Sequence, residues 1–185
     1  MSASIQAVGM VEFNSIAAGI EAADAMVKAA SVSVLVMKTI CPGKFLAGVH
    51  ADVASVRASV EAGLGRAPDA AVDHFVIANI SPAVISALSC AVECRRGSAV
   101  GILETFSAAA CVVAADAAVK AANVDLIEVR LAMGLGGKAV CLFSGDVAAV
   151  QASADAGAAQ AASAGMLVRK VVIPGMAPEL FAYIM

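Results

Sequence analysis

The sequence predicts an α+β protein made of two tandem domains that share one order of strands and helices. The main observation is an internal repeat: residues 7–12 return at 99–104, an offset of 92 residues, and residues 24–30 return at 116–122 with the same offset. Further along, Gly43-Lys44 matches Gly137-Lys138, an offset of 94. One repeat of this length indicates two similar domains, because a solenoid needs three or more shorter units.

Inside each repeat, apolar runs alternate with alanine-rich segments in the order β-α-β-β-α-β, the ferredoxin-like pattern. In the first copy the predicted elements are a strand at 5–13, a helix capped by Asn14 or Ser15, a hairpin at 32–51, a helix from Asp52 to about 63 and a strand at 72–80. In the second copy they are a strand at 98–105, a helix capped by Ser107, a hairpin at 124–145, a helix from Asp146 to about 164 and a strand at 166–173. We expect a short tail after each last strand, domains at 1–90 and 98–185, and a linker at 91–97.

Two local features refine this outline. The first predicted helix carries Ile16, Ile20, Ala23 and Val27 at helical spacing, which predicts one apolar face. The change of offset from 92 to 94 places two extra residues at the tip of the second hairpin.

Composition and charge exclude several classes of protein. Charged residues make up only 15% of the chain, yet no run reaches the ~20 apolar residues that a membrane-spanning helix needs. No charged segment followed by an apolar one opens the chain, so we expect no secretory signal and, with five cysteines, reduced thiols in the cytoplasm. A net charge of −3 without a basic run argues against nucleic acid. So few charges favour burial of the surface against further copies of the chain.

The stretch Lys38–Phe45 lies between two strand-like runs, and Cys41-Pro42-Gly43 is predicted to be the turn of the first hairpin. Proline presets its own φ and glycine tolerates positive φ, so both suit a tight turn. The turn presents the Cys41 thiol at its tip. From the turn alone, an incidental cysteine is the favoured interpretation, and a metal or redox ligand is the alternative.

Other candidate sites are weaker. Cys90 and Cys94 are four residues apart, but without further ligands nearby two ordinary thiols are favoured over a metal site. The remaining candidates have structural interpretations: Cys111 and Cys141 as core thiols, His50 and His74 as isolated histidines, and Lys28 and Lys120 as solvated lysines near helix ends. The segment from Gly134 to Lys138 lacks the spacing of a phosphate loop. With no nucleophile motif or convergent pair of carboxylates, we expect no enzyme.

The repeat and several motifs resemble the shell proteins of bacterial microcompartments, of the tandem-domain, trimer-forming kind. In the first half the matching segments are Ala7–Gly9, Ser15–Gly19, Asp24–Lys28 and Lys38–Phe45, and in the second half they are Ala99–Thr105, Gly134–Lys138 and Val172–Pro174. The resemblance covers nearly the whole chain. It implies a homotrimer that forms a flat pseudohexameric tile and assembles with other shell proteins in a cytoplasmic microcompartment.

The resemblance also implies roles for particular residues. Three copies of Cys41 would meet at a three-fold pore and bind one 4Fe-4S cluster for electron transfer, with an encapsulated redox enzyme as a further partner. The pore loops would consist of Ile40, Pro42 and Gly43 from the first hairpin, and of Gly134, Leu135, Gly136 and Gly137 from the second. Lys28 and Lys120 would lie at the tile edge. One cysteine cannot hold a cluster that usually takes four thiolates, whereas a closed trimer supplies three equal ones.

The chain departs from this family in its tail, and other functions stay open. The segment Ile173-Pro174-Gly175-Met176 lacks the arginine that often docks one shell tile into the next. One alternative is a ferredoxin-like trimer that binds a small metabolite and signals, with Cys41 incidental. Another is a shell tile with a plain metabolite pore and no cluster.

Overall fold

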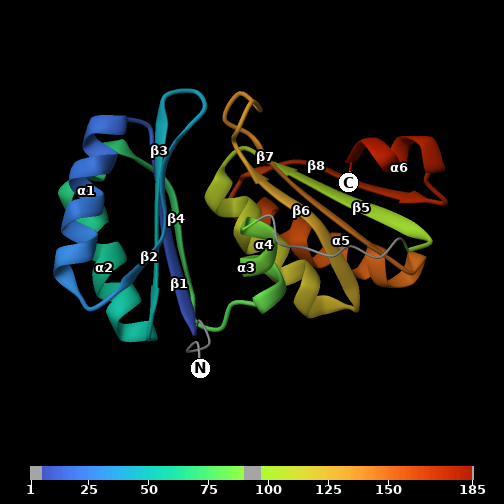
Figure 1. Ribbon diagram of the computed structural model, residues 1–185, viewed down its shortest axis with the longest axis horizontal. Coiled ribbons are helices and arrows are strands. Elements are labelled where there is room, and N and C mark those ends of the chain that lie inside the picture. The colour runs from blue at the N-terminus through green and yellow to red at the C-terminus, as the bar shows by residue number, and fades with distance from the viewer. Residues whose placement is uncertain (1–5, 90–96, 185) are drawn as a thin grey trace. The chain divides into compact units, whose positions relative to one another are not determined.

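The computed structural model describes residues 6–89 and 97–184, which form two four-stranded sheets with their helices (Figure 1). The first repeat contains β1 (Ala7–Phe13), α1 (Ile16–Ala29), β2 (Ser33–Ile40), β3 (Lys44–Ala51), α2 (Val53–Arg66), a short 3-10 helix (Pro68–Ala70), β4 (Ala71–Ile77) and α3 (Pro82–Leu88). The second contains β5 (Ala99–Thr105), α4 (Ala108–Ala121), β6 (Val124–Leu131), β7 (Ala139–Gly145), α5 (Val147–Ser163), β8 (Leu167–Pro174) and α6 (Pro178–Ile184).

The two sheets have the same topology. Their strand orders are β2-β3-β1-β4 and β6-β7-β5-β8, and all neighbouring strands that pair are antiparallel. Even the irregularities repeat, because the register shifts between Glu12 and Phe13 in one sheet and between Glu104 and Thr105 in the other. The predicted tandem α+β, ferredoxin-like architecture is therefore confirmed: the β-α-β-β-α-β unit occurs twice, once in each repeat.

The segment after each last strand differs from the prediction. The first repeat's last strand ends at Ile77, not at residue 80, and the expected short tails form the helices α3 and α6. Both helices begin with a proline, Pro82 and Pro178, which suits the first turn because that position needs no N–H donor. In α3, Val84 and Ala87 are buried, which explains why so short a helix is stable.

The core is built largely from small residues on the helices and larger ones on the strands. The buried residues of α1 are Gly19, Ala22, Ala23 and Met26. The last three pack in a cluster with Phe13 and Phe45, among other residues. At Gly19, α1 approaches β3 so closely that a Cβ would lie 2.5 Å from the Cβ of Phe45. This position therefore favours glycine. The apolar face predicted for this helix is partly wrong: Ala23 is buried, but Ile16, Ile20 and Val27 are exposed.

Long-range contacts divide the chain into two compact units that do not follow the sequence repeat. The first unit consists of Met1–Ile80, Ser107–Ala109 and Ala132–Gly137, and the second of Ser81–Phe106, Ala110–Leu131 and Lys138–Met185. The first unit therefore contains two short segments of the second repeat, Ser107–Ala109 and Ala132–Gly137. Most of the predicted linker at 91–97 lies outside the described residues. None of the described helices is long and apolar enough to cross a membrane.

Candidate functional site

The first hairpin presents Cys41 at its tip. The ladder of β2 and β3 runs to the pair Ile40 and Lys44, so Cys41-Pro42-Gly43 is the whole turn, as predicted. The Cys41–Pro42 peptide bond is cis, and Gly43 has a φ of 74°, a left-handed conformation that favours glycine. Cys41 is a free, half-buried thiol.

The second hairpin has a longer, glycine-rich tip between β6 and β7. Gly134, Gly136 and Gly137 all have positive φ values, and a Cβ at Gly134 or Gly136 would meet nothing within 4 Å. Within the first unit this loop contacts the first hairpin: the backbone N–H of Cys41 donates to the carbonyl of Ala132 at 3.2 Å. A Cβ at Gly137 would lie 2.9 Å from Cδ of Pro42, so that position favours glycine for space as well as for conformation.

The other described cysteines are chemically different from Cys41. Cys111 and Cys141 are fully buried, as expected of core residues. Burial raises the pKa of the Cys111 thiol to about 12 and raises the pKa of Cys141 well above its usual value, with the neighbouring Cys111 contributing to the second shift. Neither thiol ionises near neutral pH, so neither is a ready metal ligand. Cys90 and Cys94 lie outside the described residues.

A single chain contains no ready-made metal site in residues 6–89 and 97–184. Nowhere in these ranges do three or more His, Cys, Asp or Glu side chains gather to hold a metal ion. Cys41 supplies one soft thiolate ligand, and its position at a turn leaves it partly accessible. This donor chemistry fits an iron–sulfur cluster only when further copies of Cys41 complete the ligand set.

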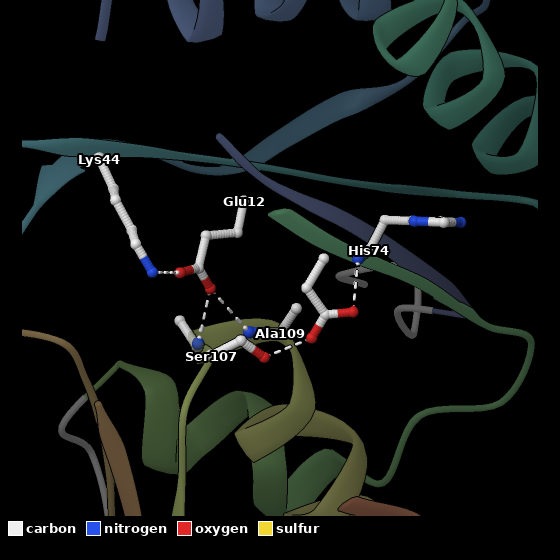
Figure 2. Close-up of polar contacts among 7 residues, drawn as sticks. Glu12, Lys44, His74, Ser107 and Ala109 are labelled. Atoms are coloured by element: carbon white, nitrogen blue, oxygen red, sulfur yellow. Dashed lines mark hydrogen bonds and ion pairs between the residues drawn. The ribbon is translucent and has the colours of Figure 1, made fainter. Parts of the chain in front are cut away.

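The structure shows a buried polar cluster that the sequence analysis missed (Figure 2). Glu12 on β1 is fully buried, and the Lys44 ammonium, at the start of β3, donates to its carboxylate at 2.7 Å. The other carboxylate oxygen accepts hydrogen bonds from the backbone N–H of Ala108 at 2.6 Å and of Ala109 at 3.4 Å, at the start of α4. A buried carboxylate is stable here because an ammonium and the positive end of a helix dipole both compensate its charge.

A second contact lies beside this cluster. The hydroxyl of Ser107 donates to the carboxylate of Asp73, and Asp73 also accepts the backbone N–H of His74 at 2.8 Å. Figure 2 shows Ser107 and Ala109 turned toward the strands that carry Glu12 and His74. Ser107, predicted as a helix cap, is thus also tied to β4, and the first turn of α4 is fixed by two carboxylates.

The second repeat carries the same ion pair in a more open setting. Lys138 and Glu104 occupy the positions of Lys44 and Glu12, and they form an ion pair in which both side chains are partly exposed. The glutamate and the Gly-Lys segment recur in both repeats of the sequence. This recurrence is the sequence signal from which both ion pairs could have been predicted.

The lysines predicted at the tile edge form local ion pairs. Lys28 is exposed and donates to Asp24 at 2.6 Å, one helical turn earlier in α1. Lys120 pairs in the same way with Asp116 in α4, and Asp116 also accepts the backbone N–H of Ser81 at 2.8 Å. An exposed ion pair at this spacing, such as Lys28 with Asp24, contributes only about 0.3–0.5 kcal/mol. The pair of Lys120 with Asp116 is part-buried, because the Asp116 carboxylate is buried.

The sequence predicts an isolated His74, but in the structure His74 lines a hollow together with other residues. A hollow of about 320 Å³ along α2 and β4 is lined by Arg57, Glu61 and His74 together with apolar residues. At the corresponding place in the second repeat, Lys170 and Gln151 both donate to Asp155, the counterpart of Glu61. The two repeats therefore differ on this face.

The fold, the tandem repeat and the two hairpin tips identify the class of protein. The BMC domain matches residues 7–80 and again residues 99–176. The chain therefore belongs to the family of bacterial microcompartment shell proteins, and it is a structural protein and not an enzyme.

Individual relatives sharpen this assignment. The chain is 46% identical over 169 residues to the bacterial microcompartment shell protein PduT of Citrobacter freundii, covering 91% of this chain and 92% of that protein. It is 47% identical over 76 residues to the shell protein EutM of Salmonella typhimurium, covering 41% of this chain and 77% of EutM. The resemblance to PduT thus extends over both repeats.

Solved structures agree with this placement. A crystal structure of a microcompartment protein from Desulfitobacterium hafniense superposes with a TM-score of 0.85 at 47% identity, covering 97% of this chain and 99% of that chain. A fused, permuted hexameric shell protein of the RMM microcompartment gives a TM-score of 0.63 at 24% identity, covering 84% and 81% of the two chains, and shows the fold alone.

Proposed function

We propose that three copies of this chain form a pseudohexameric shell tile whose three-fold pore binds a 4Fe-4S cluster through Cys41 of each copy. The observation that carries the proposal is the position of Cys41, a half-buried reduced thiol at the tip of a hairpin in a family of shell proteins. The buried Cys111 and Cys141 are unsuitable ligands, which leaves Cys41 as the candidate among the described cysteines.

Symmetry supplies the ligands that one chain lacks. A three-fold axis through the hairpin tips brings three equal thiolates together, and closed rings of this kind are common in homo-oligomers. Ile40, at the end of β2, and Pro42 and Gly43, on the turn itself, then lie next to the axis. The second hairpin tip, with Gly134, Leu135, Gly136 and Gly137, provides a thiol-free part of the pore lining.

The pore loops would control access to the site. Gly134 and Gly136 add no side chains, and the contact between Cys41 and Ala132 holds the thiol-bearing turn against the glycine-rich loop. When bound, a cluster supplies one-electron redox chemistry. Electron transfer through the tile to an encapsulated redox enzyme is the role that this chemistry suits, and the partners within the shell would be other shell proteins.

Anaerobic purification followed by iron and sulfide analysis tests the proposal. We expect about four irons per trimer, because a 4Fe-4S cluster with three cysteine ligands serves the whole trimer. Cys41→Ser should abolish iron binding, since a hydroxyl is a poor, hard ligand for iron, while size analysis still gives the wild-type oligomer.

The matched control changes cysteines elsewhere in the chain. Cys90→Ser with Cys94→Ser should leave the iron content as it is. Iron that follows Cys90 and Cys94 would place the site away from the pore. Wild-type protein without iron would leave a tile with a plain pore, and a stable wild-type monomer at micromolar concentration would contradict the tile itself.

A further inference from the structure

The hollow along α2 and the edge strand β4 lies wholly within the first unit. Arg57 and Glu61 reach it from α2, and His74 reaches it from β4. Figure 2 shows the His74 side chain pointing away from the Glu12 carboxylate, so the hollow is separate from the buried polar cluster. Its volume of about 320 Å³ is at the lower end of the range of small-molecule sites.

The wall of the hollow is apolar. Val60 and Leu64 lie on the same side of α2, because residues four positions apart on a helix share a face. On β4, Val76 follows His74 by two residues and therefore lies on the same face of the sheet. That face is turned toward α2, since Val76 pairs with Gly9, where a Cβ would lie 2.5 Å from Cγ2 of Val60. An apolar wall with a few polar groups is the usual composition of a small-molecule site.

The three polar side chains of the hollow are available to a ligand. Arg57, Glu61 and His74 are all exposed. Within residues 6–89 and 97–184, their side chains form no hydrogen bond or ion pair with one another or with other residues. One guanidinium, one carboxylate and one imidazole therefore share a hollow without partners from the described part of the chain.

The order of the charges along α2 explains why Arg57 and Glu61 stay apart. In α1, Asp24 precedes Lys28 by four residues, and the two form an ion pair at 2.6 Å. In α2 the basic residue comes first, which is the less favourable order for a pair at this spacing because it opposes the helix dipole. Two opposite charges thus lie on one helix face, with Cβ atoms about 5–6 Å apart, and both can bind a ligand.

The second repeat has a different set of side chains at the same three places. The counterparts of Arg57, Glu61 and His74 are Gln151, Asp155 and Lys170. There the Lys170 ammonium and the Gln151 amide both donate to the Asp155 carboxylate. The chain itself therefore supplies an ammonium to the carboxylate of the second repeat, whereas no described side chain supplies one to Glu61.

We propose that the hollow binds a small α-amino acid with an apolar side chain, one molecule per chain. The ligand's ammonium donates to Glu61, as the Lys170 ammonium donates to Asp155. Its carboxylate accepts from the guanidinium of Arg57, whose fork of donors matches a carboxylate. Its side chain packs against the apolar wall. A zwitterion fits because a ligand with a single charge leaves either the guanidinium or the carboxylate unpaired.

This inference goes beyond the proposed function and does not depend on a cluster at Cys41. Calorimetric titration of the purified full-length protein with leucine tests it. We expect saturable binding at one site per chain with a dissociation constant of about 0.1–1 mM, since a ligand with so few atoms binds weakly. The ligands 4-methylpentanoate and 3-methylbutylamine lack the ammonium and the carboxylate of leucine, respectively. Each should bind about tenfold more weakly or worse, because each loses a hydrogen-bonded charge.

Two variants test the charged residues separately. Glu61→Gln and Arg57→Gln each remove one charge at an exposed position, so the fold should tolerate both. Each should weaken leucine binding about tenfold or more. The matched control is Asp155→Asn, which changes the corresponding carboxylate of the second repeat and should leave the affinity for leucine unchanged.

A third variant copies the second repeat into the first. In His74→Lys, the new ammonium should donate to Glu61 as Lys170 does to Asp155, and it should occupy the place of the ligand's ammonium. Leucine binding should be lost without a fall in the melting temperature, which separates occupation of the site from damage to the fold.

The outcomes decide the inference independently of the shell function. Absence of saturable leucine binding at ten times the expected dissociation constant would overturn it. Binding that Glu61→Gln and His74→Lys both leave unchanged would place the ligand elsewhere and would overturn it too. Neither result bears on iron at Cys41 or on the oligomeric state.

Discussion

At the scale of single residues, the environment of each thiol decides its chemistry. Cys41 lies on a turn and is half-buried, whereas Cys111 and Cys141 are fully buried and have raised pKa values. The thiolate is both the nucleophile and the metal ligand, so only a thiol that can ionise and meet solvent is available. The sequence distinguishes these cysteines only by their neighbours along the chain.

Thiol titration checks this distinction. In iron-free Cys90→Ser, Cys94→Ser protein at pH 8, an aromatic disulfide reagent should modify Cys41 rapidly, and Cys111 and Cys141 only after unfolding in denaturant. Their burial and raised pKa values keep the thiolate population very small in the folded state. Rapid modification of all three in the native protein would contradict the buried positions.

At the scale of elements, two helices begin at equivalent aspartates that behave differently. Asp52 precedes α2 and accepts hydrogen bonds from the backbone N–H of Ser55 at 3.0 Å and from its hydroxyl at 2.6 Å. These bonds hold the pKa of Asp52 below its usual 3.8. Asp146 precedes α5 in the same backbone conformation, but its side chain makes no capping hydrogen bond. The sequence predicts both aspartates as helix caps, but only Asp52 makes the capping hydrogen bond.

This difference predicts a pH-dependent contribution to stability. Because the pKa of Asp52 is depressed in the fold, its stabilising effect is complete above about the unfolded value of 3.8 and is lost as the pH falls through the lower folded value. At pH 7, Asp52→Ala should therefore lower the melting temperature more than Asp146→Ala does. The gap should shrink as the pH falls below 3.8, and equal melting temperatures at pH 7 would contradict the assignment.

At the scale of the whole molecule, the tandem repeat leaves matching residues in unequal surroundings. Residues that one repeat buries within the chain, such as Val112 and Leu126, have exposed counterparts in Ile20 and Val34. This imbalance is expected of a chain that completes itself by contact with further copies, because exposed apolar faces favour association. Lys28 and Lys120, in contrast, each form an ion pair within their own helix.

The edge lysines give a prediction about tile-to-tile assembly. Lys28→Asp with Lys120→Asp should leave the proposed trimer intact in solution, since both lysine side chains are exposed. If these lysines lie at the contacts between tiles, the wild-type protein should assemble into extended sheets under the electron microscope and the double variant should not. Lys170→Asp, which changes a lysine of β8 instead, is the control, and sheets of unchanged extent in the double variant would remove the lysines from the tile edge.

The sequence by itself determined the repeat, the order of elements up to the last strand of each repeat, and the position of Cys41 on a turn. These features follow from local signals: hydrophobic periodicity, cap residues, and a Cys-Pro-Gly segment between two strand-like runs. The registers of the two sheets match in the structure, where Ala7 pairs with Ala51 and Ala99 with Gly145.

Only the tertiary structure decided which apolar residues are buried and which charges are paired. The spacing of Ile16, Ile20 and Val27 predicts an apolar face, but α1 packs through its small residues because close approach to a sheet depends on side-chain volume. Glu12 and Lys44 lie 32 residues apart, and Glu12 and Ala108 lie 96 apart. No local pattern encodes contacts between residues so distant in the chain, because they arise only when the folded strands bring one carboxylate, one ammonium and one helix start together.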